Sequence, residues 1–174
     1  MHARTLGLAI ACVVLAGCSS GDPESLDNLS DAERGELPVL DHQGVKEQIA
    51  QHKGRIVALA AWSANREGHE AFYKGLGGLA AGDAEAGPVV IAMNLDGAVA
   101  VRDKVLPLIR EVQPAFANCV FDGDQMMLTA VVDPEWAGLL PAVWLYDGEG
   151  KVAASFYGAN ALDRARAKLA EMAK

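Results

Sequence analysis

The residues best placed to do chemistry stand in the stretch AAWSANREGHE, where Ser63, Arg66 and His69 follow an apolar run that ends at Trp62. A serine hydroxyl becomes a nucleophile when a base accepts its proton and an oxyanion hole faces it. His69 is the nearest candidate base, but a separation of six residues is a poor match to one face of a helix. We therefore expect Ser63 to cap the following helix, and Arg66 to be solvated or to meet a carboxylate.

Cysteine is the other reactive residue type, and the chain contains Cys12, Cys18 and Cys119. The first two belong to an N-terminal segment described below, which leaves Cys119 as the lone thiol of the mature chain. One thiol cannot cycle between dithiol and disulfide; it forms a mixed disulfide, dimerises or stays inert in a core. Because Cys119 falls on a predicted strand, we expect it to be buried and inert, and a reactive thiol is the alternative.

The first residues have the layout of a bacterial lipoprotein signal. A basic residue, Arg4, precedes a short apolar core from Leu6 to Ala16. That core is too short to span a bilayer comfortably and is typical of a secretory signal peptide. The sequence LAGC then ends at Cys18 and resembles the lipobox, in which the cysteine is acylated and becomes the first mature residue. We expect a signal peptide at 1–17, lipidation at Cys18 and a flexible acidic tether over 18–36.

The composition limits the partners and cofactors. The chain of 174 residues has a formal charge of −8, which argues against nucleic acid and anionic headgroups as partners. Half of the residues are apolar, enough for one globular core. The histidines that remain after processing, His42, His52 and His69, have no metal-ligand spacing, and the glycines do not form a phosphate loop. We expect neither a metal ion nor a cofactor.

After residue 36 the pattern alternates between strands and helices. Apolar runs predict strands at 55–62, 87–95 and 115–121. Amphipathic or helix-favouring stretches predict helices at 44–54, 63–80, 101–112, 122–133 and 160–174. Pro107 is expected to kink the helix at 101–112 or to start a new one. Residues 141–158 predict a β-hairpin around the turn DGEG, so the fold class is an α/β sandwich with a mixed sheet.

Four stretches together resemble the thioredoxin-like superfamily, in particular the membrane-anchored TlpA/ResA-like thiol-disulfide oxidoreductases. The stretches are KGRIVALAAWSANRE, VVIAMNLDG, LLPAVWLYDGEGKV and FYGAN, within residues 37–174. The resemblance implies a three-layer α/β/α sandwich with a C-terminal hairpin and a final helix, and a cis-proline at Pro141. It also places Ser63 and Arg66 where the family has its two redox cysteines. A serine hydroxyl is not an anion at neutral pH and Arg66 has no sulfur, so this position cannot exchange disulfides.

The resemblance further implies a peptide groove bordered by Trp62, Ala64, Asn65, Leu140 and Pro141. In the family this edge pairs with the main chain of a bound peptide, which requires no sulfur. The alternative is that both residues are purely structural: Trp62 covers the end of the sheet, and Pro141 fixes a turn.

We expect a redox-inactive lipoprotein that binds peptides or scaffolds proteins at the cell envelope, outside the cytoplasm and more in keeping with the outer membrane. The alternative is a thiol-disulfide oxidoreductase acting through Cys119 or through a partner's thiols. A third reading places the interaction on a surface other than the groove.

Overall fold

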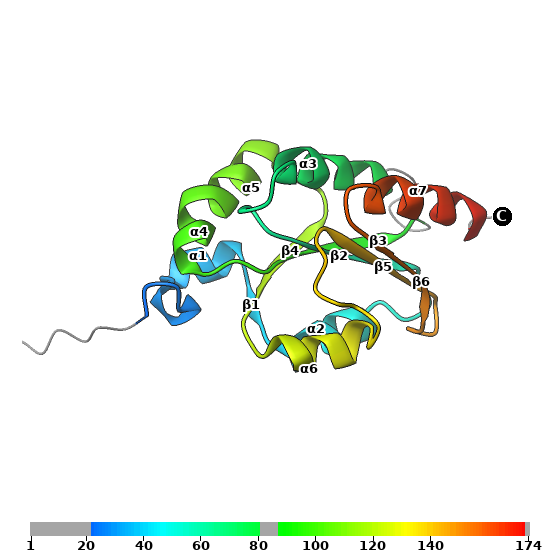
Figure 1. The fold of residues 1–174 in the computed structure, drawn as a ribbon, viewed down its shortest axis with the longest axis horizontal. Helices are drawn as coiled ribbons and strands as arrows, with labels where there is room; N and C mark the ends of the chain where they lie inside the picture. Colours follow the sequence, from blue (N-terminus) through cyan, green and yellow to red (C-terminus); the bar gives the residue numbers. More distant parts are fainter. Residues whose placement is uncertain (1–21, 81–86, 173–174) are drawn as a thin grey trace, which may run out of the picture.

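The computed structural model describes residues 22–80 and 87–172 (Figure 1). In this part of the chain six strands form one mixed sheet in the order β1-β4-β3-β2-β5-β6. The strands are β1 (Val39–Leu40), β2 (Val57–Trp62), β3 (Val89–Asn94), β4 (Ala117–Phe121), β5 (Ala142–Tyr146) and β6 (Val152–Tyr157). The first four in this order are parallel neighbours, whereas β5 and β6 add as an antiparallel hairpin.

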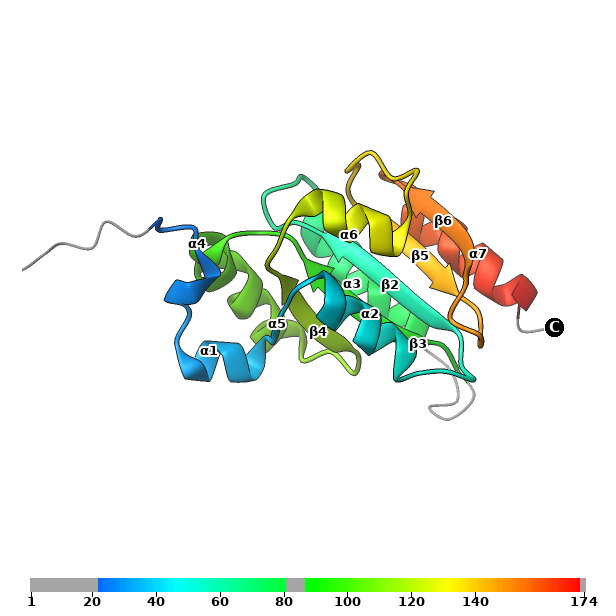
Figure 2. The same ribbon diagram turned by 90° about the horizontal axis from the view of Figure 1, so that it is seen from below.

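Helices cover both faces of the sheet. They are α1 (Asp31–Glu36), α2 (His42–Ala50), α3 (His69–Ala80), α4 (Ala98–Ala100), α5 (Leu106–Val112), α6 (Gln125–Val132) and α7 (Ala161–Met172). A 3-10 turn, η1 (Leu26–Asn28), precedes α1, and a π-helical turn, η2 (Val101–Val105), joins α4 to α5. Figure 1 shows α3, α5 and α7 on one side of the sheet, and Figure 2 shows α2 and α6 on the other.

The alternation of side chains along β2 divides the core between these two layers. Ala58, Ala60 and Trp62 face the layer of α3, α5 and α7, whereas the intervening Leu59 and Ala61 face α2 and α6. All six residues of β2 are buried, because it is a central strand with helices on both faces. The three-layer α/β/α sandwich with a mixed sheet, C-terminal hairpin and final helix is therefore confirmed.

Two helix predictions have different outcomes. Pro107 lies in the first turn of α5, directly after the π-helical turn, so the predicted change of helix at this proline is confirmed. The helix predicted from residue 63 instead begins six residues later, at His69. Residues 63–68 form a turn, and Gly68 ends it with φ of 76°, a conformation that favours glycine.

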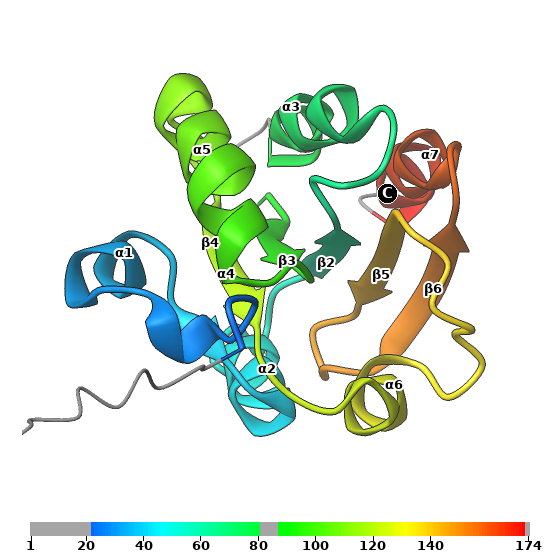
Figure 3. The same ribbon diagram turned by 60° about the vertical axis from the view of Figure 1, so that its left-hand side comes forward.

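Residues 22–36 were expected to be a flexible tether, and this expectation is wrong. Leu26 and Leu29 are about 95% buried in the core layer of α3 and α5. Ser30 and Glu33 form a capping box at the start of α1, which stabilises that short helix. We call residues 22–36 the strap; it lies beside α4 and α5 in Figure 3.

Salt bridges fix the strap to the domain. Arg102 donates from Nε to Glu33 at 3.0 Å and from Nη2 to the carbonyl of Asn28. Arg110 makes a bidentate pair with Glu36, with N···O distances of 2.8 and 2.9 Å. The two buried leucines and the two arginine–glutamate salt bridges make the strap part of the folded domain.

The predicted signal peptide and the lipidation site Cys18 lie outside the described residues. Within 22–80 and 87–172, none of the helices combines the length and the apolar character needed to cross a bilayer.

The packing of the strap makes a stability prediction. Replacing Leu26 by alanine in the chain from residue 19 onward should lower the free energy of unfolding by about 2–4 kcal/mol, because it empties a buried leucine site. Urea denaturation followed by circular dichroism measures this change. The control is Leu139→Ala, an exposed leucine whose loss should cost no more than about 0.5 kcal/mol. If both substitutions had equally small effects on the free energy of unfolding, residues 22–36 would be a flexible tether after all.

Candidate functional site

The turn at 63–68 lies at the carboxyl edge of the parallel strands. β2 and β3 are parallel and pair in register from Val57 with Val89 to Trp62 with Asn94. The segments that leave these strands therefore emerge side by side. At this edge of an open α/β sheet, ligand sites commonly form between the departing loops.

A buried carboxylate, Asp96, joins the two segments. Its Oδ1 accepts hydrogen bonds from Ser63 Oγ at 2.5 Å and Asn65 Nδ2 at 3.2 Å. Its Oδ2 accepts from the backbone N–H of Ala64 at 2.6 Å and from Asn94 Nδ2 at 2.8 Å. The Asp96 side chain is 7% exposed, so these four donors replace the water that the carboxylate has lost. Asp96 thus holds the turn 63–68 against the end of β3.

Ser63 takes its role from this carboxylate. Its hydroxyl donates to Asp96 and accepts from the backbone N–H of Asn65 at 3.1 Å. Since α3 begins at His69, the prediction that Ser63 caps this helix is wrong. His69 Nδ1 faces the carbonyl oxygen of Arg66 at 2.8 Å, so that ring nitrogen carries the proton and is no base for Ser63. Ser63 is a structural hydrogen-bonding group in this arrangement.

The other turn residues separate into two groups. Ala64 is buried, and Asn65 bridges Asp96 to Lys104, whose Nζ donates to Asn65 Oδ1 at 2.6 Å. Arg66 is exposed and lines a pocket beside the turn. The two residues that the resemblance sets at the redox positions therefore differ in their surroundings: Ser63 is hydrogen-bonded to a buried carboxylate, and Arg66 faces solvent.

The pocket beside the turn has a volume of about 260 Å³. Apolar side chains form most of its wall, with charged side chains at the rim. The lining residues are Trp62, Ser63, Arg66, Glu67, Gly68, His69, Ala71, Phe72, Leu140, Pro141, Ala159, Leu162 and Asp163. Three of the five predicted groove residues, Trp62, Leu140 and Pro141, are among them, whereas Ala64 and Asn65 lie outside this lining.

Trp62 forms the inner end of this pocket, which we call the groove. Its ring stacks on His69 with a centroid distance of 6.5 Å and packs against Tyr73 at 4.8 Å. The residue is 2% exposed, and its indole N–H is buried without a hydrogen-bond partner in the structure. A buried donor without a partner is costly, so this N–H is an unsatisfied polar group behind the groove.

The loop that carries Pro141 is fixed from both sides. Asp133 accepts hydrogen bonds from Ser155 at 2.7 Å and from Tyr157 on β6. Trp136 Nε1 donates to the carbonyl of Leu139 at 3.0 Å. The Leu140–Pro141 peptide bond is cis. These contacts hold the wall of the groove at the start of β5, opposite Trp62.

Cys119 lies on β4, away from the groove. It is 3% exposed and packs in the core layer of α2 and α6. Burial raises the pKa of its thiol to about 12, so the thiolate that exchanges disulfides is scarce at neutral pH. The structure therefore places this thiol as the sequence analysis expected, buried within a strand.

Asp96 is the site residue that the sequence analysis missed. The available signal was the polar pair Asn94 and Asp96 directly after an apolar strand, since side chains at the ends of parallel neighbours meet at one edge. Among the described residues, no group of three or more histidine, cysteine or acidic side chains is arranged to hold a metal ion.

The role of Asp96 predicts a cost for its neutralisation. Replacing Asp96 by asparagine places an amide donor among four donors and should lower the free energy of unfolding by about 2–4 kcal/mol. Urea denaturation of the soluble chain measures this change. Asp103→Asn, an exposed position on η2, is the matched control and should be nearly neutral. An Asp96→Asn variant as stable as this control would refute the role.

The position of Cys119 predicts its reactivity. In the native protein at pH 8, an aromatic disulfide reagent should not release its chromophore, because the thiol is buried and its pKa is about 12. After unfolding in denaturant the same thiol should react rapidly. The measurement is absorbance of the released thiolate over time. Rapid reaction of the folded protein would contradict the burial.

No protein-family model matches the sequence, and no curated protein matches it either. Solved structures do match. A proposed thiol:disulfide interchange protein DsbE from Chlorobium tepidum aligns with a TM-score of 0.56 at 22% identity, covering 72% of this chain and 84% of that one. A secreted Mycobacterium tuberculosis disulfide oxidoreductase homologous to DsbE aligns with a TM-score of 0.51 at 17% identity over 70% and 85%.

A third match is the exposed lipoprotein thioredoxin Etrx1 of Streptococcus pneumoniae, with a TM-score of 0.50 and 19% identity over 71% of this chain and 89% of that one. At these identities the likeness concerns the fold. With its sheet order, flanking helices and the hairpin after Pro141, the chain has a thioredoxin-like fold.

Proposed function

We propose that this protein is a lipoprotein of the bacterial cell envelope that binds an extended peptide segment in its groove and does not exchange disulfides. The observation that carries the proposal is the contrast between the two parts of the site. The groove of Trp62 and Pro141 is built and open, while the dithiol positions hold Ser63 and Arg66. Recognition is thus retained without the sulfur chemistry.

The side chains at these positions lack the chemistry of disulfide exchange. Ser63 donates to Asp96 at 2.5 Å and has no ionised form at neutral pH that would attack a disulfide. Arg66 supplies no resolving thiol. Cys119 is buried with a raised pKa, which disfavours the alternative in which it acts as the redox residue.

The size and lining of the groove favour a peptide. A volume of about 260 Å³ is below the usual 300–1,000 Å³ of sites that enclose a whole small ligand or cofactor. An apolar wall of Phe72, Pro141 and Leu162 suits one or two apolar side chains of an extended chain. The rim charges Arg66, Glu67 and Asp163 would select the flanking residues.

The location rests on the N-terminal sequence, in which the apolar stretch ends in LAGC at Cys18. It has support from a structural neighbour that is itself described as an exposed lipoprotein.

Disulfide chemistry is tested by reduction of insulin with dithiothreitol, using the chain from Ser19 onward and its Cys119→Ser variant. We expect both to leave the rate at that of dithiothreitol alone. Acceleration by the first that is lost in the second would make Cys119 the active residue and overturn the redox-inactive assignment.

Peptide binding is tested by selection from a displayed library of random peptides, followed by calorimetry with selected sequences. Ala159→Trp, which fills the groove from an exposed position, should weaken binding by about tenfold or more, equivalent to about 1.4 kcal/mol. Ala153→Trp, on an exposed part of β6 away from the groove, is the control and should bind as the natural protein does. Peptides that bind Ala159→Trp unchanged, or a failed selection, would refute the groove as the binding site.

A further inference from the structure

The strap gives the N-terminal end of the described chain a fixed position. Leu26 and Leu29 are buried, and Arg102 and Arg110 clasp Glu33 and Glu36. Upstream of them, the backbone N–H of Ala98 donates to the carbonyl of Glu24 at 3.0 Å. Nothing between these contacts and Asp22 is long enough to act as a hinge. Asp22 is therefore held at one place on the domain.

That place is the end of the domain that carries the groove. Asp22 shares a hollow of about 440 Å³ with Asp96 and with Gln125. Asp96 bonds the turn at Ser63, and Gln125 opens α6, which follows the carboxyl end of β4. The N-terminal end of the strap and the turn 63–68 therefore lie at the same edge of the sheet, next to Asp96.

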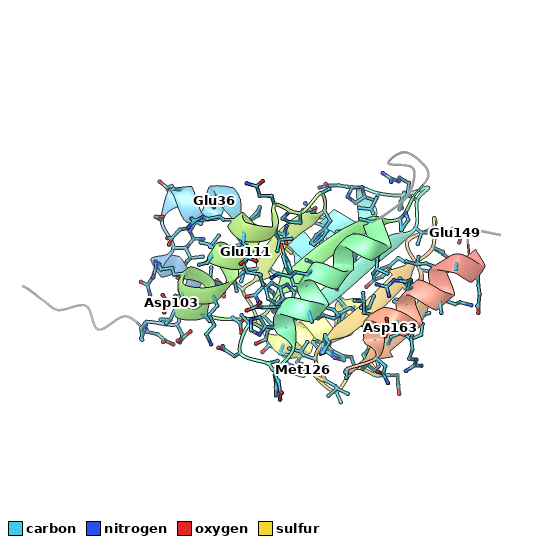
Figure 4. The ribbon with its side chains drawn as sticks, turned by 90° about the horizontal axis from the view of Figure 1, so that it is seen from above. Glu36, Asp103, Glu111, Met126, Glu149 and Asp163 are labelled. Carbon is cyan, nitrogen blue, oxygen red and sulfur yellow. The ribbon has the colours of Figure 1, made fainter. Side chains whose placement is uncertain are left out.

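Two exposed apolar side chains also lie at this end. Met126 is 75% exposed and Leu139 is 56% exposed. Gln125, next to Met126 in the chain, lies against Gly138, next to Leu139: its Nε2 is 2.8 Å from the position that a Cβ on Gly138 would occupy. Figure 4 shows Met126 projecting from the domain, far from Glu149 in the β5–β6 turn. The side chains of Met126 and Leu139 both present apolar surface to solvent at the carboxyl edge of the sheet.

The length of chain beyond Asp22 limits how the domain can turn. Cys18, the predicted lipidation site, is four Cα steps from Asp22, a reach of about 14 Å when fully extended. A domain of this size has a radius of gyration of about 15 Å. The segment from Cys18 to Asp22 is therefore no longer than the radius of the domain. Because Asp22 is fixed at the groove end, this short segment keeps the opposite end of the domain away from the membrane.

We infer that the strap holds the groove end of the domain against the anchoring membrane, with Met126 and Leu139 at the lipid surface. Asp22, Glu24 and Asp122 line the hollow at this end of the domain, and Asp124 caps α6 two residues before Met126. Zwitterionic headgroups therefore suit this end of the domain, and anionic ones are repelled. The inference rests on the predicted acylation of Cys18. It narrows the proposed function, because a peptide that reaches the groove would come from a segment next to the membrane.

Fluorescence quenching in vesicles tests the orientation. The full-length acylated protein is reconstituted in phosphatidylcholine and phosphatidylethanolamine vesicles that contain nitroxide-labelled headgroups. A fluorophore is attached at Met126→Cys or at Glu149→Cys in a Cys119→Ala background. Since β5 runs antiparallel to β2, the β5–β6 turn lies at the start of β2, opposite the groove. We expect several-fold stronger quenching at position 126 than at position 149.

A longer linker between Cys18 and Asp22 is the matched control. An insertion of roughly twenty glycine and serine residues after Gly21 gives a flexible linker of greater reach than the domain, and should bring the two positions toward equal quenching. Equal or reversed quenching without the insertion would overturn the inference, as would failure of the acylated protein to attach to vesicles. Peptide binding by the soluble chain is measured without a membrane, so failure of the proposed function is distinguished from failure of the orientation.

Discussion

The carboxylate of Asp96 is the interaction on which the site depends, because it ties together segments that the strands alone would leave free. It accepts hydrogen bonds from Ser63, Ala64 and Asn65 of the turn and from Asn94 at the end of β3. With these contacts the chain leaves β2 as a compact turn and enters α3 only at His69. The outer face of that turn is one wall of the groove, so the shape of the groove follows from a group buried behind it.

The opposite wall is built by a second set of polar contacts. Asp133 accepts from Ser155 and Tyr157, and Trp136 donates to the carbonyl before Leu140. The two walls meet over the ring of Trp62, which is stacked and buried. A groove held by hydrogen bonds on both sides is preorganised, and a bound segment loses less conformational entropy in such a site. This rigidity suits recognition as well as it suits catalysis.

The sequence predicts those parts of the structure that depend on local patterns. Continuous apolar runs identify β2 and β3, the DGEG turn identifies the hairpin, and Pro107 marks the change of helix. The strap was missed because its two leucines stand in a polar, acidic context and its arginine partners follow 69 and 74 residues later. Asp96 was missed for the same reason, since its contacts with the turn span 31 to 33 residues. Long-range polar pairing leaves no periodic signal.

The contact between Ser63 and Asp96 also limits what a cysteine could do at position 63. A cysteine in place of Ser63 would set its sulfur beside a buried carboxylate, and a neighbouring negative charge disfavours the thiolate. A reactive thiol at a helix start needs the opposite surroundings, namely free N–H groups and positive charge. Here the helix starts six residues further on, and the nearby N–H of Ala64 is already bonded to Asp96. Placing cysteines at positions 63 and 66 would therefore not by itself produce a reactive dithiol, because the electrostatics around position 63 suit a neutral hydroxyl.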